Sequence, residues 1–130
     1  MPFEIFPEPS GMYVRYHGHV TPEEMVRSVA DGLIDPSFDC CQYRINDFLG
    51  VQSFEFSEEA FEYVAAISSG GAFTRQRDGV NGLVAQVAVQ SSHLDLIVRY
   101  SALGIVPYRF GTFATVDSAR QWVASEIARR

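Results

Sequence analysis

Hydrophobic and polar residues follow two repeating patterns along this chain. Segments of alternating or nearly continuous apolar residues predict β-strands over residues 3–6, 12–18, 43–47, 83–89 and 108–113. Segments with apolar residues three and four positions apart predict helices over residues 22–33, 58–68 and 92–103, and a last helix that starts after Thr115 or Asp117. This alternation predicts a mostly parallel sheet with right-handed crossovers. We therefore expect one α/β domain over residues 1–130, with four or five strands and about four helices.

Capping signals mark two of the helix starts. Thr21 and Glu24 have the spacing of a capping box, and Pro22 suits the first helical turn. Ser57 stands before two glutamates, where its hydroxyl can cap the free N–H groups of the next helix. The inward faces of the last two helices each carry four apolar residues: Leu94, Ile97, Val98 and Ala102 in one, and Ala119, Trp122, Val123 and Ile127 in the other.

The stretch from residue 43 to residue 57 organises the prediction. It reads as a central strand that ends at Asp47, turns at Gly50 and continues into the helix capped by Ser57. Ligands of open α/β sheets bind at the carboxyl ends of the strands, so this strand end is the first place to look for a site.

The order of several local motifs resembles the anti-sigma-factor-antagonist fold (STAS, SpoIIAA-like). These motifs are Gly-His-Val-Thr-Pro-Glu-Glu at 18–24, a strand ending in Asp47, a strand at 84–89 followed by a serine-capped helix, and Ala-Arg-Gln-Trp-Val at 119–123. They extend over roughly 120 residues, and the resemblance is an analogy of layout. It implies a SpoIIAA-like (STAS-like) domain.

One departure from that family bears on function. Phosphoregulated antagonists carry an Asp-Ser-Ser-Gly-like turn after the central strand, with a serine as the kinase target. Here residues 47–53 read Asp-Phe-Leu-Gly-Val-Gln-Ser, which lacks that motif. Ser53 and Ser57 are the nearby hydroxyls, and capping explains Ser57 without phosphorylation. The resemblance therefore does not imply a sigma-factor circuit.

Composition excludes several classes of partner. The net charge is −6, with 16 acidic and 10 basic residues, which disfavours nucleic acid and anionic membranes. No apolar run approaches the ~20 residues of a membrane-spanning helix, and the N-terminus lacks the pattern of a signal peptide. All ten basic residues are Arg, so lysine chemistry is excluded. Cys40 and Cys41 are adjacent, which suits two reduced thiols in a cytoplasmic protein.

Histidine and aspartate offer the candidates for chemistry. Asp47 at a strand end can be a general base, or it can shape a turn by accepting backbone N–H bonds. His17 and His19 can form a metal site with His93 or Asp47, or they can be ordinary solvated imidazoles. We favour the structural interpretation in both cases and predict no catalytic residue, no metal and no cofactor.

Two further groups are candidates for contact or regulation. Arg75 and Arg77 stand in the long connection 72–82, where they can clamp an anionic group or form ordinary surface charge. Phe48, Phe54 and Phe56 cluster around the strand end, where exposed apolar surface would mark a partner, a dimer face or a lipid-like ligand.

We therefore expect a non-enzymatic domain that acts through a protein partner or as a homodimer, with Asp47, the three phenylalanines, Ser57, Arg75 and Arg77 as candidate contact or regulatory residues. The alternatives are a small apolar or lipid-like ligand, and a phosphoregulated antagonist. An enzyme that uses Asp47 and a histidine is the least favoured.

Overall fold

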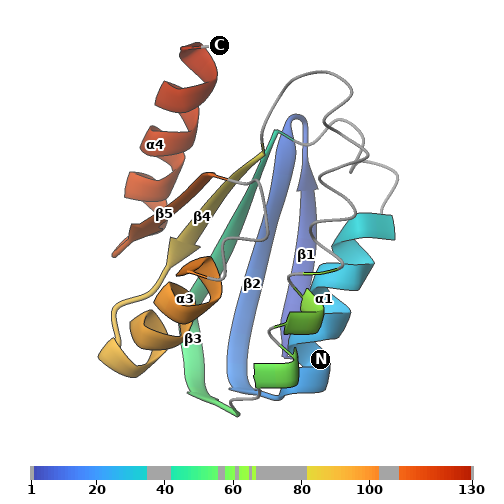
Figure 1. Cartoon of the computed structure of the whole chain (residues 1–130). Coiled ribbons are helices and arrows are strands. Elements are labelled where there is room, and N and C mark those ends of the chain that lie inside the picture. Colours follow the sequence, from blue (N-terminus) through green and yellow to red (C-terminus); the bar gives the residue numbers. More distant parts are fainter. Residues whose placement is uncertain are drawn as a thin grey trace.

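The predicted α/β fold is confirmed. The computed structural model describes residues 2–34, 42–55, 58–60, 62–64, 66, 82–102 and 109–129 (Figure 1). The elements in chain order are β1 (Phe3–Glu8), β2 (Gly11–Val20), α1 (Pro22–Ile34), β3 (Tyr43–Phe54), β4 (Leu83–Val87), α3 (Ser91–Ala102), β5 (Arg109–Phe113) and α4 (Val116–Ala128). The five strands form one sheet in the order β1-β2-β3-β4-β5, in which only β1 is antiparallel to its neighbour.

Helices cover the two faces of the sheet unequally. α1 and α3 lie on one face, as expected for right-handed crossovers between neighbouring parallel strands (Figure 1). The buried residues of that side are Phe3, Val14, Tyr16, Val20, Phe48, Val51, Ala88 and Ile97. α4 lies on the other face, over a second cluster formed by Ile45, Leu83, Ala85, Val87, Ala119 and Val123. The sheet therefore lies between two hydrophobic cores, one on each face.

The edge strand β1 is longer than the predicted segment 3–6 and passes through Pro7. The N–H of His17 donates to the carbonyl of Pro2, so the even-numbered residues of β1 pair with β2 through their backbone. Pro7 then falls at a position whose missing N–H faces away from β2. An edge strand tolerates proline at such a position.

The predicted N-caps of the first and last helices are confirmed. The backbone N–H of Glu24 donates to Thr21 Oγ1, and the N–H of Thr21 donates to Glu24 Oε1, both at 3.3 Å. The last helix starts at Thr115, whose hydroxyl accepts the N–H of Ser118 at 3.1 Å, and Asp117 lies inside the first turn. Both capping residues satisfy N–H groups that a helix leaves free.

The predicted end of the central strand at Asp47 is wrong, because β3 continues through Phe54. Arg15 pairs with Asp47, but His17 pairs with Gly50, so two residues of β3 stand opposite one of β2. A second shift leaves Gln52 without a counterpart in β2. Each shift is a β-bulge, which inserts a residue into one strand and turns the following side chains to the other face.

The bulges explain why the sequence pattern predicted the wrong end for the central strand. Phe48, Val51 and Phe54 all pack into the same core, although they are three positions apart. A regular strand repeats every two residues, and a spacing of three is typical of turns and helices. Gly50 therefore marks a bulge inside a strand instead of a turn after it.

Three smaller predictions need correction or fall outside the description. Val98 was expected to face inward, but its side chain is 60% exposed. β4 ends at Val87 and not at residue 89. Residues 58–60, 62–64 and 66 are helical, as predicted, and the remainder of that helix lies outside the described residues. None of the described helices combines the length and apolar character that a membrane crossing requires.

The bulges can be tested by two truncations on the same strand. In a regular strand, residues 49 and 51 face the same way, so their truncations would cost similar free energy. Here Val51 is buried and Leu49 is exposed. We expect Val51→Ala to lower the free energy of unfolding by about 2 kcal/mol and Leu49→Ala to change it by less than about 0.5 kcal/mol. Urea unfolding of dilute protein measures both, and equal costs would contradict the assigned register.

Candidate functional site

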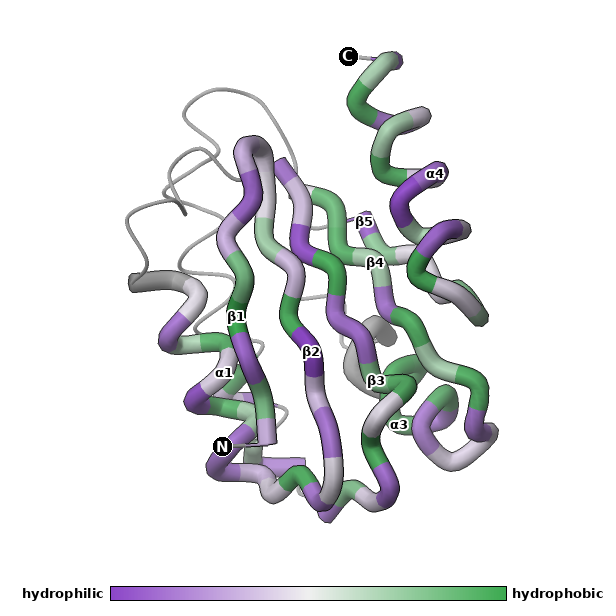
Figure 2. Tube along the Cα trace, turned by 180° about the vertical axis from the view of Figure 1, so that it is seen from behind, coloured by the Kyte–Doolittle hydropathy of each residue, from purple (hydrophilic) through white to green (hydrophobic). Residues whose placement is uncertain are grey.

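The side of the sheet that carries α4 is only partly covered. α4 packs against β3, β4 and β5, whereas α1 lies against β1 and β2 from the opposite side. Figure 2, seen from this side, shows α4 near β4 and β5 and no described helix in front of β1 and β2. Phe6, whose ring centre lies 5.9 Å from that of Tyr13, is 44% exposed there. Leu49 of β3 is 45% exposed and does not belong to the core beneath α1 and α3, so we assign it to the same side. We call this surface the open face; it consists of Glu4, Phe6, Tyr13, Arg15 and Leu49.

A charged link joins α4 to the rim of the open face. The guanidinium of Arg120 donates to both carboxylate oxygens of Glu8, at 2.8 and 3.1 Å. The hydroxyl of Tyr43 donates to Glu8 at 2.5 Å, and Arg120 also lies 5.5 Å from the centre of the Tyr13 ring. The hydrogen bonds from Arg120 hold the pKa of Glu8 below its ordinary value. The link thereby fixes the C-terminal helix against the N-terminal hairpin.

Asp47 lies in the middle of β3 and is buried. The hydroxyl of Tyr13 donates to its Oδ2, and the N–H of Leu49 donates to its Oδ1 at 2.9 Å. The first bulge takes Leu49 out of the regular ladder, so Asp47 satisfies the backbone at that point. Burial, followed by the bond to Asp47, raises the pKa of Tyr13 to about 12. The interpretation of Asp47 as a residue that accepts local N–H groups fits this geometry, although no turn is present.

Two of the three candidate phenylalanines belong to an interior aromatic row. Phe48 stacks on Tyr16 with ring centres 4.7 Å apart, and Phe54 lies 5.5 Å from Phe48. The ring of His93 meets Phe54 edge-on at 4.9 Å. Phe48 is only 4% exposed, so it does not form the exposed contact surface expected from the sequence. The open face, on the other side of the sheet, carries the exposed apolar residues of β1 and β3.

Phe56, Ser57, Arg75 and Arg77 lie outside the described residues. Their contact or regulatory roles stay predictions, as does any such role for Phe54. Among the described residues of the sequence-based list, the structure brings Phe48 and Phe54 together, while the Asp47 carboxylate bonds to Tyr13 and to the N–H of Leu49.

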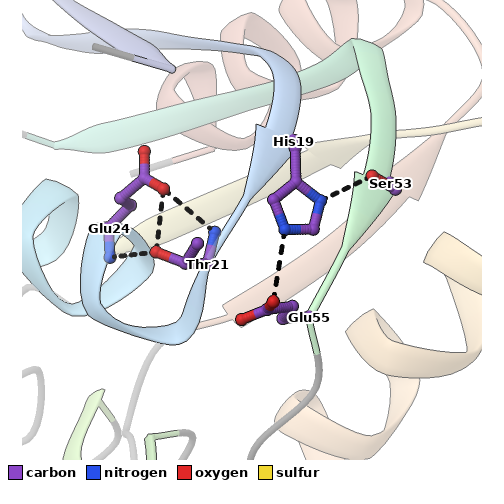
Figure 3. Close-up of polar contacts among 5 residues, drawn as sticks. All are labelled: His19, Thr21, Glu24, Ser53 and Glu55. Carbon is purple, nitrogen blue, oxygen red and sulfur yellow. Dashed lines mark hydrogen bonds and ion pairs between the residues drawn. The ribbon is translucent and has the colours of Figure 1, made fainter.

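A cluster of polar side chains stands at the carboxyl ends of β2 and β3 (Figure 3). His19 Nδ1 and Ser53 Oγ are 2.6 Å apart, and His19 Nε2 lies 3.5 Å from Glu55 Oε1. All three residues are exposed. The capping pair of Thr21 and Glu24 lies beside them in the turn that leads into α1.

The histidines do not combine into the metal site considered from the sequence. His17 lies 3.7 Å from Glu4 on β1, while His19 faces Ser53 on β3. His93 is buried against Phe54 in the opposite core. Within the described ranges, no three His, Cys, Asp or Glu side chains lie close enough together to hold a metal ion.

A polar row inside the helix-covered core was missed by the sequence reasoning. Arg44 Nε donates to Asn46 at 2.7 Å, and Asn46 donates to Gln86 of the neighbouring strand at 2.9 Å. Arg44 Nη2 also donates to the hydroxyl of Tyr16, which is bonded to Ser28 of α1. Gln86 interrupts the otherwise apolar strand β4, and that was the available signal. The row fixes α1 and the central strands in one arrangement.

Comparison with known proteins finds similarity at the level of structure. No family model and no curated protein matches the sequence. A solved structure of an uncharacterised DUF3478-family protein from Shewanella loihica, described as having a SpoIIAA-like fold, superposes with a TM-score of 0.60 at 15% identity and covers 93% of both chains. The Bacillus cell fate determinant SpoIIAA in its phosphorylated form gives 0.54 at 14% identity, over 93% of this chain and 98% of that one.

The chain has a SpoIIAA-like fold. This confirms the resemblance drawn from the order of the motifs. Identities of 14% and 15% establish the shared SpoIIAA-like architecture.

The tyrosines on the α4 side predict alkaline sensitivity. The pKa values of Tyr13 and Tyr43 are about 12 in the folded protein, against about 10 in an unfolded chain. The folded state thus holds these protons more tightly, so their stabilising contribution is complete below pH 10 and is lost as pH rises toward 12. Urea unfolding between pH 9 and 12 should show this decline, and Tyr43→Phe should make it shallower. An unchanged pH slope in that variant would contradict the assignment.

The buried His93 predicts that the folded protein also loses stability in mild acid. Burial lowers the pKa of His93 below its ordinary value. The unfolded chain therefore takes up a proton more readily as pH falls below about 6.5, and stability is lost in that direction. Replacing His93 with Phe should reduce the fall in melting temperature between pH 7 and pH 5. His17, which is only half-buried, is the matched control, and His17→Gln should leave most of the fall in place.

Proposed function

We propose that this chain is a non-catalytic SpoIIAA-like domain that acts through protein–protein contact, and that its open face binds a second copy of the chain. The observation that carries the proposal is the exposure of Phe6 and Leu49 on a sheet face that α4 only partly covers. Exposed apolar side chains on a partly covered sheet face are typical of interaction surfaces.

The charges of the open face favour a second copy as the occupant. A twofold interface pairs one patch with itself, so the patch has to be self-complementary. Glu4 and Arg15 stand opposite each other on β1 and β2 and supply both signs. The chain as a whole carries a net charge of −6. A surface of balanced charge avoids the repulsion that two acidic chains would otherwise meet.

The edge of the sheet is a poorer place for pairing than the face. β1 is an edge strand, and Pro7 offers no N–H on its outer side. Proline on an edge strand hinders the addition of another strand. This favours packing of face against face.

The engagement of Asp47 supports a non-catalytic role for that residue. Both of its carboxylate oxygens accept hydrogen bonds within the fold, from Tyr13 and from the N–H of Leu49. A general base has to be within reach of its substrate, and the Asp47 side chain is buried. In the described geometry, Asp47 instead secures the bulge.

The two alternatives drawn from the sequence stay predictions. An apolar or lipid-like ligand would have to be held by residues beyond those that form the described aromatic row. A phosphoregulated role would involve Ser57, which lies outside the described residues, or Ser53. The similar structure of SpoIIAA is of its phosphorylated form, and this keeps the alternative open to experiment.

The dimer can be tested by light scattering and sedimentation over a concentration series. Wild-type protein should show a monomer–dimer equilibrium. Leu49→Arg should raise the dissociation constant at least about tenfold, since burying an unpaired charge costs more than about 1.4 kcal/mol. Val98→Arg is the matched control, because Val98 is an exposed apolar residue of α3 away from the open face. It should leave the equilibrium unchanged.

Three outcomes would contradict the proposal. A wild-type monomer at all concentrations excludes the second copy, and capture of a different protein through an intact open face would identify another occupant. A dimer that weakens equally with Val98→Arg and Leu49→Arg would place the interface elsewhere.

A further inference from the structure

His19 and Ser53 face each other because of the second bulge. Gly18 pairs with Val51, but the next pair along β2 is His19 with Ser53, which leaves Gln52 as the extra residue. Gly18 has φ of 69°, a conformation that glycine adopts without strain. Without the bulge, His19 would stand opposite Gln52, and the serine would point to the other face. The irregular backbone therefore brings a hydroxyl and an imidazole to 2.6 Å.

Glu55 favours one of the two neutral forms of the His19 ring. Its carboxylate lies 3.5 Å from Nε2, so a neutral imidazole protonated at Nε2 is favoured. Nδ1 then has a free lone pair, and the Ser53 hydroxyl donates to it (Figure 3). The backbone N–H of Glu55 donates to the carbonyl of Val20 at 2.9 Å, which holds the ends of β2 and β3 together. Ser53 thus supplies a hydroxyl, His19 a base, and Glu55 a group that orients the base.

We propose that Ser53 is a nucleophile that accepts an acyl group from an activated ester, with His19 as its general base and Glu55 as the positioning residue. A serine is a weak nucleophile until an adjacent base removes its proton, and this arrangement provides such a base. The step modifies Ser53 once without turnover, so it agrees with a non-catalytic domain, and it uses residues other than those proposed for contact with a partner.

The reaction balances without a further reactant. Ser53 Oγ forms a bond to the carbonyl carbon of the ester while its proton moves to His19 Nδ1. When the donor is an aryl ester, the tetrahedral intermediate then expels the aryloxide, which leaves with the electron pair of the broken C–O bond. His19 releases its proton to water, and Ser53 retains the acyl group. With p-nitrophenyl acetate, the products are acetylated Ser53, p-nitrophenolate and one proton.

Exposure to solvent lets an acyl donor reach the site and limits how strongly the site can activate Ser53. Ser53, His19 and Glu55 all face solvent, so a donor can reach the hydroxyl without a change of fold. Solvent also weakens the interaction of Glu55 with the imidazolium that forms. The chemistry is therefore assigned to donors with a good leaving group.

The test is acetylation of the full chain by p-nitrophenyl acetate, followed by peptide mass spectrometry. Ser53 should gain one acetyl group faster than Ser125, an exposed serine of α4. His19→Gln should slow the modification of Ser53 about tenfold to a hundredfold, which is at or below the usual range for a general base. His17→Gln is the matched control, because His17 also lies near a glutamate but serves no hydroxyl in this cluster. It should leave the rate unchanged.

Glu55 is tested separately, because it acts through His19. Glu55→Gln should slow acetylation of Ser53 severalfold, and Glu55→Asp should restore part of the rate, while thermal unfolding shows that both variants remain folded. Equal rates in the two variants would contradict a positioning role.

Two results would overturn the assignment: acetylation of Ser53 no faster than that of Ser125, or a rate unaffected by His19→Gln. Measuring the same rates in Leu49→Arg separates this site from the dimer. If the open face is an interface, the variant becomes monomeric and still acetylates Ser53.

Discussion

The pairing of β2 with β3 is the constraint on which the rest of this structure depends. The two strands are parallel, but β3 uses two more residues than β2 over the same length. Because a strand alternates its side chains with a period of two, each added residue reverses the faces of all residues after it. The two bulges therefore decide which residues of β3 enter the core and which face solvent.

Polar groups of the fold compensate for these irregularities. At the first bulge, Asp47 accepts the N–H of Leu49 and is itself held by Tyr13. At the second bulge, Ser53 and His19 bond across the strands. Inside the helix-covered core, Arg44 and Asn46 make a further row that fixes β3 against α1 and β4. An unsatisfied buried polar group costs about 1–3 kcal/mol, so such partners make an irregular central strand tolerable.

The placement of α4 decides what the surface offers. This helix covers the half of the sheet formed by β3, β4 and β5, and Arg120 anchors it to Glu8 on the opposite edge strand. None of the described helices covers one face of the hairpin of β1 and β2, and Phe6 is exposed on it. The same side of β2 continues to His19, where the serine and glutamate stand. The proposed interface and the proposed nucleophile are thus neighbours that depend on different residues.

The sequence by itself determined the elements and their order. The capping box of Thr21 and Glu24, the period of the last helix and the apolar run of β4 are local signals, which depend only on residues close together in the sequence. They were enough to predict an α/β fold, and the resemblance in the order of the motifs added the expectation that it is SpoIIAA-like. Asp47 was also correctly singled out as a residue that accepts local backbone N–H groups.

Only the tertiary structure decided how the central strand is used. Spacing alone cannot show a bulge, since the extra residues are defined by what stands opposite them on another strand. For that reason the sequence pattern predicted a surface position for Phe48 and a strand end at Asp47, and both predictions were wrong. It also gave no sign that His19 pairs with Ser53. The stretch from Tyr43 onward remains the centre of the molecule, and its functional surface is set by register, which arises between strands and not within one.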